Sequence, residues 1–134
     1  MEPPFESGGG GLVSTIDDFH AFCRMLLNNG APILSRASVR LMTSDQVTPE
    51  QRAGSDLFFE RHSSWGLGMG VDIARNEIFH TPGRYGWTGG FGTTSYIDPA
   101  ENLIAILFTQ RMLDSPDAPK LFVDFFTLTY SAME

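Results

Sequence analysis

The chain has few basic residues and almost no cysteine. Among its 134 residues, 16 acidic side chains outnumber 9 basic ones, and the net charge is −7. A surface of this sign repels polyanions, so we expect no nucleic-acid partner. Cys23 is the only cysteine, which excludes an intrachain disulfide. Its apolar neighbours Phe22 and Leu26 predict that it is a small buried side chain on a helix.

Long apolar runs and metal-binding motifs are also missing. No stretch approaches the roughly 20 apolar residues of a membrane-spanning helix, so we expect no membrane span. The histidines His20, His62 and His80 show no paired ligand spacing, and we expect no metal ion or other cofactor. They could join Ser63 or Ser64 in a nucleophilic triad, but the chain has no Gly-x-Ser-x-Gly turn to support one.

The first half of the chain predicts two helices and a long loop. The length and the 42% hydrophobic content fit one domain over residues 1–134. Apolar spacing predicts a helix that begins near Thr15, and Ser35 is a candidate cap for a second helix. Residues 48–64 are polar and mixed, which favours a long loop.

The second half predicts an antiparallel sheet and a closing helix. The apolar run 103–108 is typical of a central strand buried on both faces. The expected order is therefore two N-terminal helices, an antiparallel sheet of three to four strands, and a C-terminal helix packed on that sheet, which is an α+β fold. The expected elements are strands at 65–73, 77–79, 91–97 and 103–109, a glycine loop at 84–92, a hairpin turn at 98–102, and a helix at 119–133 capped by Asp117.

The most informative segment is rich in glycine. Residues 86–93 read Gly-Trp-Thr-Gly-Gly-Phe-Gly-Thr and come directly before an expected strand. Backbone without Cβ atoms can bring its N–H groups close to a ligand, which predicts one wall of an active site. Glycines before a strand can also serve only a bulge or tight packing.

Several short segments resemble a known superfamily in their order and spacing, over nearly the whole chain. They are Gly9-Gly10-Gly11-Leu12-Val13-Ser14-Thr15 with Asp17-Asp18-Phe19, Leu34-Ser35, Leu41-Met42-Thr43, Gly66-Leu67-Gly68-Met69-Gly70, Gly86-Trp87-Thr88-Gly89-Gly90, Asp98-Pro99 and Thr109-Gln110. Together they resemble the C-terminal part of the serine β-lactamase and penicillin-binding-protein-like superfamily, nearest to its β-lactamase-related esterases and peptidases. The resemblance implies part of a β-lactamase-like α/β/α fold.

The resemblance also implies roles for particular residues. The superfamily carries a third sequence element on a strand, and Trp87-Thr88-Gly89 is similar to its Trp-x-Gly form. Gly90 would then offer its backbone N–H as one oxyanion donor, and Phe91 would line the substrate wall. A second register places Arg84-Tyr85-Gly86 at this element, with Arg84 receiving a substrate carboxylate. We prefer the tryptophan register because it keeps the spacing to Asp98-Pro99 without a gap. It lacks a cationic anchor, which favours ester or peptide substrates.

Two elements of the superfamily are absent from the sequence. Lys120 is the only lysine and Asp117 stands three residues before it, so Ser-x-x-Lys does not occur, and neither does Tyr-x-Asn. We therefore expect a C-terminal piece of a serine hydrolase that acts on an ester, amide or β-lactam through an acyl-enzyme. We expect the piece alone to be inactive. The alternative is a non-catalytic binding or interaction module that keeps the cleft edge. An open sheet edge that pairs with itself would favour the hydrolase piece.

Overall fold

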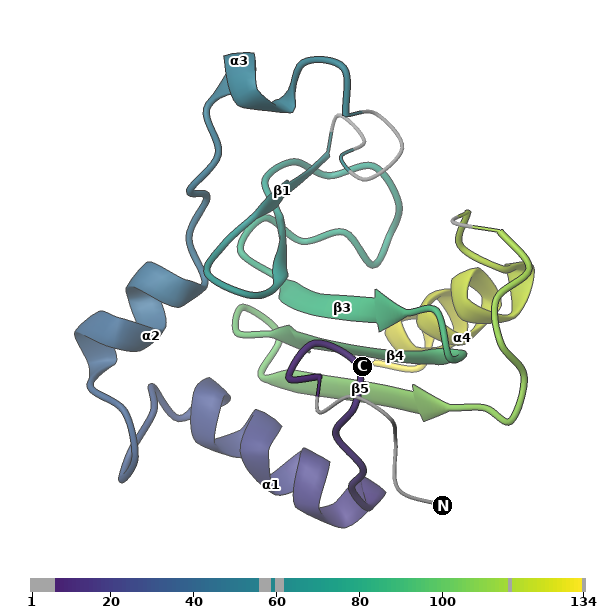
Figure 1. The fold of residues 1–134 in the computed structure, drawn as a ribbon, viewed down its shortest axis with the longest axis horizontal. Coiled ribbons are helices and arrows are strands. Elements are labelled where there is room, and N and C mark those ends of the chain that lie inside the picture. Colours follow the sequence, from purple (N-terminus) through teal and green to yellow (C-terminus); the bar gives the residue numbers. More distant parts are fainter. Residues whose placement is uncertain (1–6, 56–58, 60–61, 116, 134) are drawn as a thin grey trace.

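The protein is described by a computed structural model that covers residues 7–55, 59, 62–115 and 117–133. Among these residues, three helices come first along the chain, then five strands, then a last helix. Because helices and strands are segregated in this way, the fold is α+β, as predicted (Figure 1). The elements are α1 (Ile16–Leu27), α2 (Arg36–Met42), α3 (Pro49–Arg52), β1 (Ser63–Trp65), β2 (Gly70–Asp72), β3 (Tyr85–Gly89), β4 (Thr93–Asp98), β5 (Leu103–Phe108) and α4 (Lys120–Ser131).

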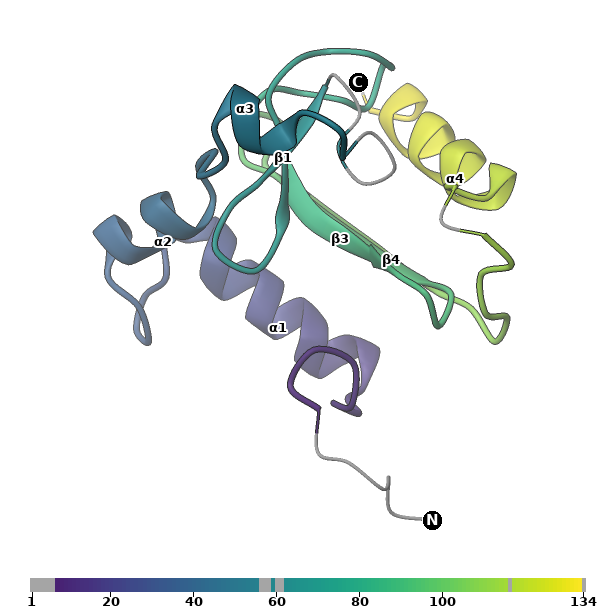
Figure 2. The ribbon, with the colours of Figure 1, turned by 45° about the horizontal axis from the view of Figure 1, so that its top comes forward.

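The sheet has five strands in the order β1-β2-β3-β4-β5, one or two more than expected, and each pairs antiparallel with the next. Helices α1 and α4 lie on opposite faces of it (Figure 2). Because successive side chains of a strand point to opposite faces, the sheet contributes side chains to two separate hydrophobic cores, one on each face. Tyr85 and Ile97 pack with Cys23 of α1, whereas Tyr96 and Ala105 pack with Phe126 of α4.

The predicted helices form where local signals are strongest. Thr15 caps α1 by accepting a hydrogen bond from the Asp18 N–H, and Ser35 caps α2 in the same way. The prediction that Cys23 is buried is confirmed, and burial raises the pKa of its thiol to about 11. Asp117 is not the cap of α4, since that helix begins after Pro119 and has no side-chain cap. No helix among the described residues is long and apolar enough to cross a bilayer.

The expected loop at 48–64 and the expected strand at 65–73 were right only in part, and the expected strand at 77–79 was wrong. Residues 56–58 and 60–61 of that loop lie outside the described residues. Thr48 and Gln51 form a capping box, which starts the short helix α3 inside the expected loop. Residues 65–73 divide into parts of β1 and β2, because Gly68 has a φ of +93° and turns the chain between them. Residues 77–79 form a turn rather than a strand.

Two further corrections concern β3 and β5. Residues 85–89 form a strand, so the glycine loop is limited to the turn at 90–92. The apolar strand β5 contacts both α1 and α4, but among the described residues it pairs only with β4 and is the terminal strand of the sheet. A sequence typical of a central strand therefore occupies an edge.

Candidate functional site

Strand β3 is paired on both sides over only part of its length. Tyr85 and Gly86 pair with both β2 and β4. From Trp87 to Gly89, the described residues provide a partner on the β4 side alone. The hairpin of β1 and β2 ends before this point, and β3 continues past it (Figure 1). The outward backbone groups of residues 87–89 are therefore available to a ligand.

The side chains of residues 87 and 88 in this open stretch point to opposite faces of the sheet and have different surroundings. Trp87 is 43% exposed and meets the ring of Trp65 edge to face, with ring centroids 4.6 Å apart. Such pairs stabilise beyond the area they bury. Thr88 points to the other face, where its Oγ1 lies 2.8 Å from the Thr94 Oγ1. An apolar aromatic surface thus borders the open backbone, while the threonine is tied into the sheet.

The turn after β3 leaves one backbone donor open. The Gly92 N–H donates to the Gly89 carbonyl at 3.0 Å, and the Leu113 N–H donates to the Gly90 carbonyl at 2.9 Å. Among the described residues, no acceptor takes a hydrogen bond from the Gly90 N–H. A Cβ built on Gly90 would have no atom within 4 Å. The adjacent Phe91 is 64% exposed, so this turn is open to a ligand.

Arg84 and Tyr85, which belong to the second register, lie inside the protein. The Tyr85 ring is in the core with Cys23, and burial raises the pKa of its hydroxyl to about 12. Arg84 is 2% exposed and donates from Nε to the Asp72 carboxylate at 2.6 Å. In this conformation neither side chain is open to a substrate, and the cation of Arg84 is engaged by Asp72.

Aromatic rings surround the Arg84 guanidinium. Its central carbon lies 4.1 Å from the centroid of Tyr96 and 5.0 Å from that of Phe126. These contacts join α4 to the sheet through a cation and aromatic faces. Burial raises the pKa of Asp72, and the nearby Arg84 cation opposes this effect.

The fold also brings together His62, Asp72 and His80, whose possible ligand atoms all lie within 4.8 Å of one another. Three features favour a polar network over a metal site. The His80 Nδ1 already accepts a hydrogen bond from the Glu77 N–H at 3.2 Å, and Asp72 is paired with Arg84. The imidazoles of His62 and His80 are stacked, with centroids 3.9 Å apart and planes 30° apart, so their in-plane lone pairs do not converge.

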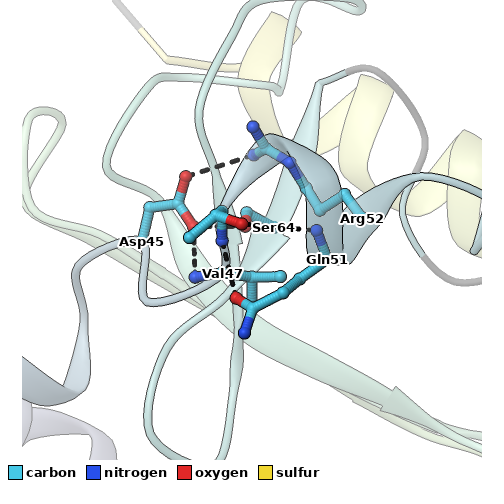
Figure 3. Close-up of polar contacts among 6 residues, drawn as sticks. Asp45, Val47, Gln51, Arg52 and Ser64 are labelled. Atoms are coloured by element: carbon cyan, nitrogen blue, oxygen red, sulfur yellow. Dashed lines mark hydrogen bonds and ion pairs between the residues drawn. The ribbon is translucent and has the colours of Figure 1, made fainter.

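Ser64, one of the two serines considered for a triad, is hydrogen-bonded to an aspartate and not to a histidine. Ser64 is buried in β1 and donates its hydroxyl hydrogen bond to Asp45 (Figure 3). Asp45 also accepts from the Val47 N–H and from Arg52. These hydrogen bonds lower the pKa of Asp45, against the opposing effect of its burial. The group anchors the segment before α3 to β1, next to Trp65.

Sequence reasoning missed the partners that complete the site. Trp65 is only the first residue of the expected strand at 65–73 in the sequence analysis, yet its ring supports Trp87 beside the open edge. The spacing of Asp72, His80 and Arg84 gives no local signal of their contact. The alternation of Tyr85, Trp87 and Gly89 with Gly86 and Thr88 could have predicted a strand.

Comparisons with known proteins identify a matching family and two curated relatives. The family described as Beta-lactamase matches residues 1–124. Two curated relatives come from Mycobacterium tuberculosis, "Uncharacterized protein MT1414" of strain CDC 1551 / Oshkosh and "Protein Rv1367c" of strain ATCC 25618 / H37Rv. Each is 37% identical over 123 residues, which cover 84% of this chain and 31% of the relative. The chain thus spans about a third of the length of these relatives.

Proposed function

The chain belongs to the Beta-lactamase family, and on this basis we propose that it supplies one wall of a serine-hydrolase active site. The observation that supports the proposal most directly is the half-paired strand β3, which leads into the open N–H of Gly90. In the proposed site, one ligand contacts both the backbone of residues 87–89 and this donor. Because the sequence has no Ser-x-x-Lys, we place the nucleophile on another segment.

The proposed reaction is acyl transfer from an ester, amide or β-lactam to that serine. Attack on the carbonyl carbon places negative charge on its oxygen, and the Gly90 N–H would donate to this oxyanion. The nucleophile's own backbone N–H would be the second donor. Loss of one such donor typically costs about 2.7 to 4 kcal/mol of transition-state stabilisation. The role of this chain is therefore electrostatic stabilisation and substrate positioning.

Residues 87–89 would position an extended substrate by adding it to the sheet edge as a short strand. Trp87, supported by Trp65, would contact an apolar group next to the scissile bond. Phe91 would extend this apolar wall, while Thr88 would hold β3 on β4. Because Arg84 is buried and paired with Asp72, the proposed site has no cationic anchor from this position. Ester or peptide substrates fit it better than those that need a carboxylate receptor.

An amide-resolved titration tests the proposed binding edge. We expect an N-acyl dipeptide amide added to ¹⁵N-labelled chain to shift the resonances of Trp87, Gly89 and Gly90 most. Gly90→Pro removes the N–H and should weaken binding. Gly90→Ala is the matched control, since it keeps the N–H and its Cβ has open space. Shifts confined to other parts of the chain, or no saturable shifts, would argue against this edge.

Two further observations test the placement of the nucleophile. The isolated chain should neither hydrolyse a chromogenic short-chain ester nor gain the mass of a penicillin. Stoichiometric acylation seen by mass spectrometry would contradict a nucleophile on another segment. A Ser-x-x-Lys motif encoded upstream of Met1 would support the hydrolase, whereas its absence there would support the non-catalytic binding module.

A further inference from the structure

The turn at 90–92 packs against the segment that follows β5. Residues 109–113 lie beside this turn in both views (Figures 1 and 2). The Gly92 carbonyl accepts two hydrogen bonds from Thr109, one from its N–H at 3.1 Å and one from its hydroxyl at 2.8 Å. A Cβ built on Gly92 would overlap the Arg111 carbonyl oxygen, so the two segments are in close contact. We call residues 109–113 the brace.

Hydrogen bonds hold the peptide groups on both sides of Gly90. The peptide group that Gly90 shares with Gly89 is held by the Gly92 N–H, which donates to the Gly89 carbonyl at 3.0 Å. The peptide group that Gly90 shares with Phe91 is held by the brace, because the Leu113 N–H donates to the Gly90 carbonyl at 2.9 Å. A peptide group is planar, so a hydrogen bond to its carbonyl restricts the direction of its N–H as well.

This arrangement directs the Gly90 N–H out of the turn. The N–H belongs to the same trans peptide group as the Gly89 carbonyl, and the two bonds of such a group point in opposite directions. The Gly89 carbonyl points at the Gly92 N–H within the turn, so the Gly90 N–H points away from it. A donor whose direction is set in advance stabilises a developing oxyanion without reorganisation during the reaction.

We propose that Thr109 is a positioning residue for this donor and acts through Gly92 and the brace. The inference rests on the proposed function, since it concerns the oxyanion donor of that site. The Thr109 hydroxyl donates to the Gly92 carbonyl and accepts from the Arg111 N–H at 3.3 Å. One hydroxyl thus joins the turn to the brace and sets the bend that brings the Leu113 N–H to Gly90. Without it, the Arg111 N–H loses this acceptor and the brace is held less firmly.

The mobility of the Gly90 amide in the ligand-free chain tests the brace. Thr109→Val removes the hydroxyl and keeps the shape of the side chain. We expect the ¹⁵N order parameter of Gly90 to fall from about 0.85, typical of rigid backbone, toward about 0.6. Thr109→Ser keeps the hydroxyl and should restore the value. Thr129→Val is the matched control, because the Thr129 hydroxyl donates to the Phe125 carbonyl at 2.7 Å within α4, and it should leave Gly90 unchanged.

Binding of the N-acyl dipeptide amide tests the functional role. Thr109→Val should weaken it about two- to tenfold, which corresponds to the net strength of one neutral hydrogen bond. The ligand-induced shift should decrease more at Gly90 than at Trp87, since Trp87 pairs with β4 and does not depend on the brace. No binding by the unsubstituted chain would contradict the proposed site and the positioning role together. Unweakened binding by Thr109→Val would contradict the positioning role alone.

Hydrogen exchange on the unsubstituted chain tests the brace without a substitution. The amides of Gly92 and Leu113 should be protected and open together, whereas that of Gly90 should exchange freely. An unprotected Leu113 amide would overturn the proposal. So would an unchanged Gly90 order parameter in Thr109→Val, an equal fall in Thr129→Val, or a failure of Thr109→Ser to restore the value.

Discussion

Arg84 donates its Nε–H to Asp72 across 2.6 Å, and the two side chains are only 3% and 5% exposed. The pair joins the residue before β3 to the end of β2. The Arg84 Nη1 is buried without a hydrogen-bond partner among the described residues, so the guanidinium is only partly satisfied. The free energy needed to remove two charges from water exceeds the free energy gained from a single imperfect contact between them. Loss of either side chain would therefore leave the other charge buried without its partner and destabilise the fold.

Arg84→Met should destabilise the fold by about 3 to 5 kcal/mol, because it leaves the Asp72 carboxylate buried and unpaired. The double variant Asp72→Leu/Arg84→Met should recover most of this loss, since it removes both charges. Urea denaturation of both variants measures the two values. A double variant that is no more stable than Arg84→Met would show that the pair itself stabilises the fold.

Stability should fall as the pH drops below 6.5 because of His80. Burial, followed by the charges of His62 and Arg84, lowers the pKa of His80 from 6.5 to about 3. Between these values the unfolded chain binds a proton that the folded chain does not, so folding becomes less favourable on acidification. One such proton gives at most about 1.4 kcal/mol per pH unit. Urea denaturation at a series of pH values measures this slope.

The matched variant for this measurement is His80→Asn, which does not titrate and can still accept from the Glu77 N–H. Its stability should depend less on pH than that of the unsubstituted chain. Asp72 acts in the opposite direction, since its raised pKa favours the folded state as the carboxyl becomes protonated. An unchanged pH profile in His80→Asn would rule out His80 as the cause.

Gly86→Ala and Gly90→Ala should differ sharply in stability. A Cβ on Gly86 would overlap the Ser95 carbonyl oxygen and crowd the Tyr96 Cα on β4. We expect a loss of about 1 to 3 kcal/mol or more, as for other overpacked sites, whereas Gly90→Ala should stay within about 0.5 kcal/mol. Thermal and urea unfolding compare them directly. Equal losses at both positions would contradict the strand geometry described for β3.

Tyr130→Phe should loosen α4 from the sheet. The Tyr130 hydroxyl donates to the Asp98 Oδ2 at 2.8 Å, and Asp98 is 1% exposed. Since this hydrogen bond goes to a buried carboxyl group, its loss should cost about 1.5 to 3 kcal/mol. Leu128→Ala, on the same helix and 69% exposed, is the control and should change little. Similar stabilities of the two variants would count against this anchor.

The sequence predicts those parts of the fold that depend on neighbouring residues. Thr15 and Ser35 start their helices through hydrogen bonds three residues away, and the β4–β5 hairpin turns at Asp98 through bonds to the N–H groups of Ala100 and Glu101. These interactions are local, so sequence spacing reveals them.

The parts that could not be predicted depend on contacts across the sheet. Gly86 suggested a loop, but its glycine is required because β4 passes too close for a Cβ. The sequence is compatible with an Arg84 side chain that faces a ligand. Only the register of β2 against β3 brings this side chain to Asp72. For the same reason, pairing order alone places β5 at an edge despite its apolar sequence.

The length of the β1–β2 hairpin sets how many backbone hydrogen bonds a ligand can form with β3. The hairpin stops pairing with β3 at Gly86, so the strand positions from Trp87 onward are uncovered. One further residue pair in the hairpin would cover Trp87, and two more would close the strand up to Gly89. The length of the hairpin therefore determines how long a ligand segment can pair with β3, both in natural variants and in redesigned ones. It can change without altering any residue of β3.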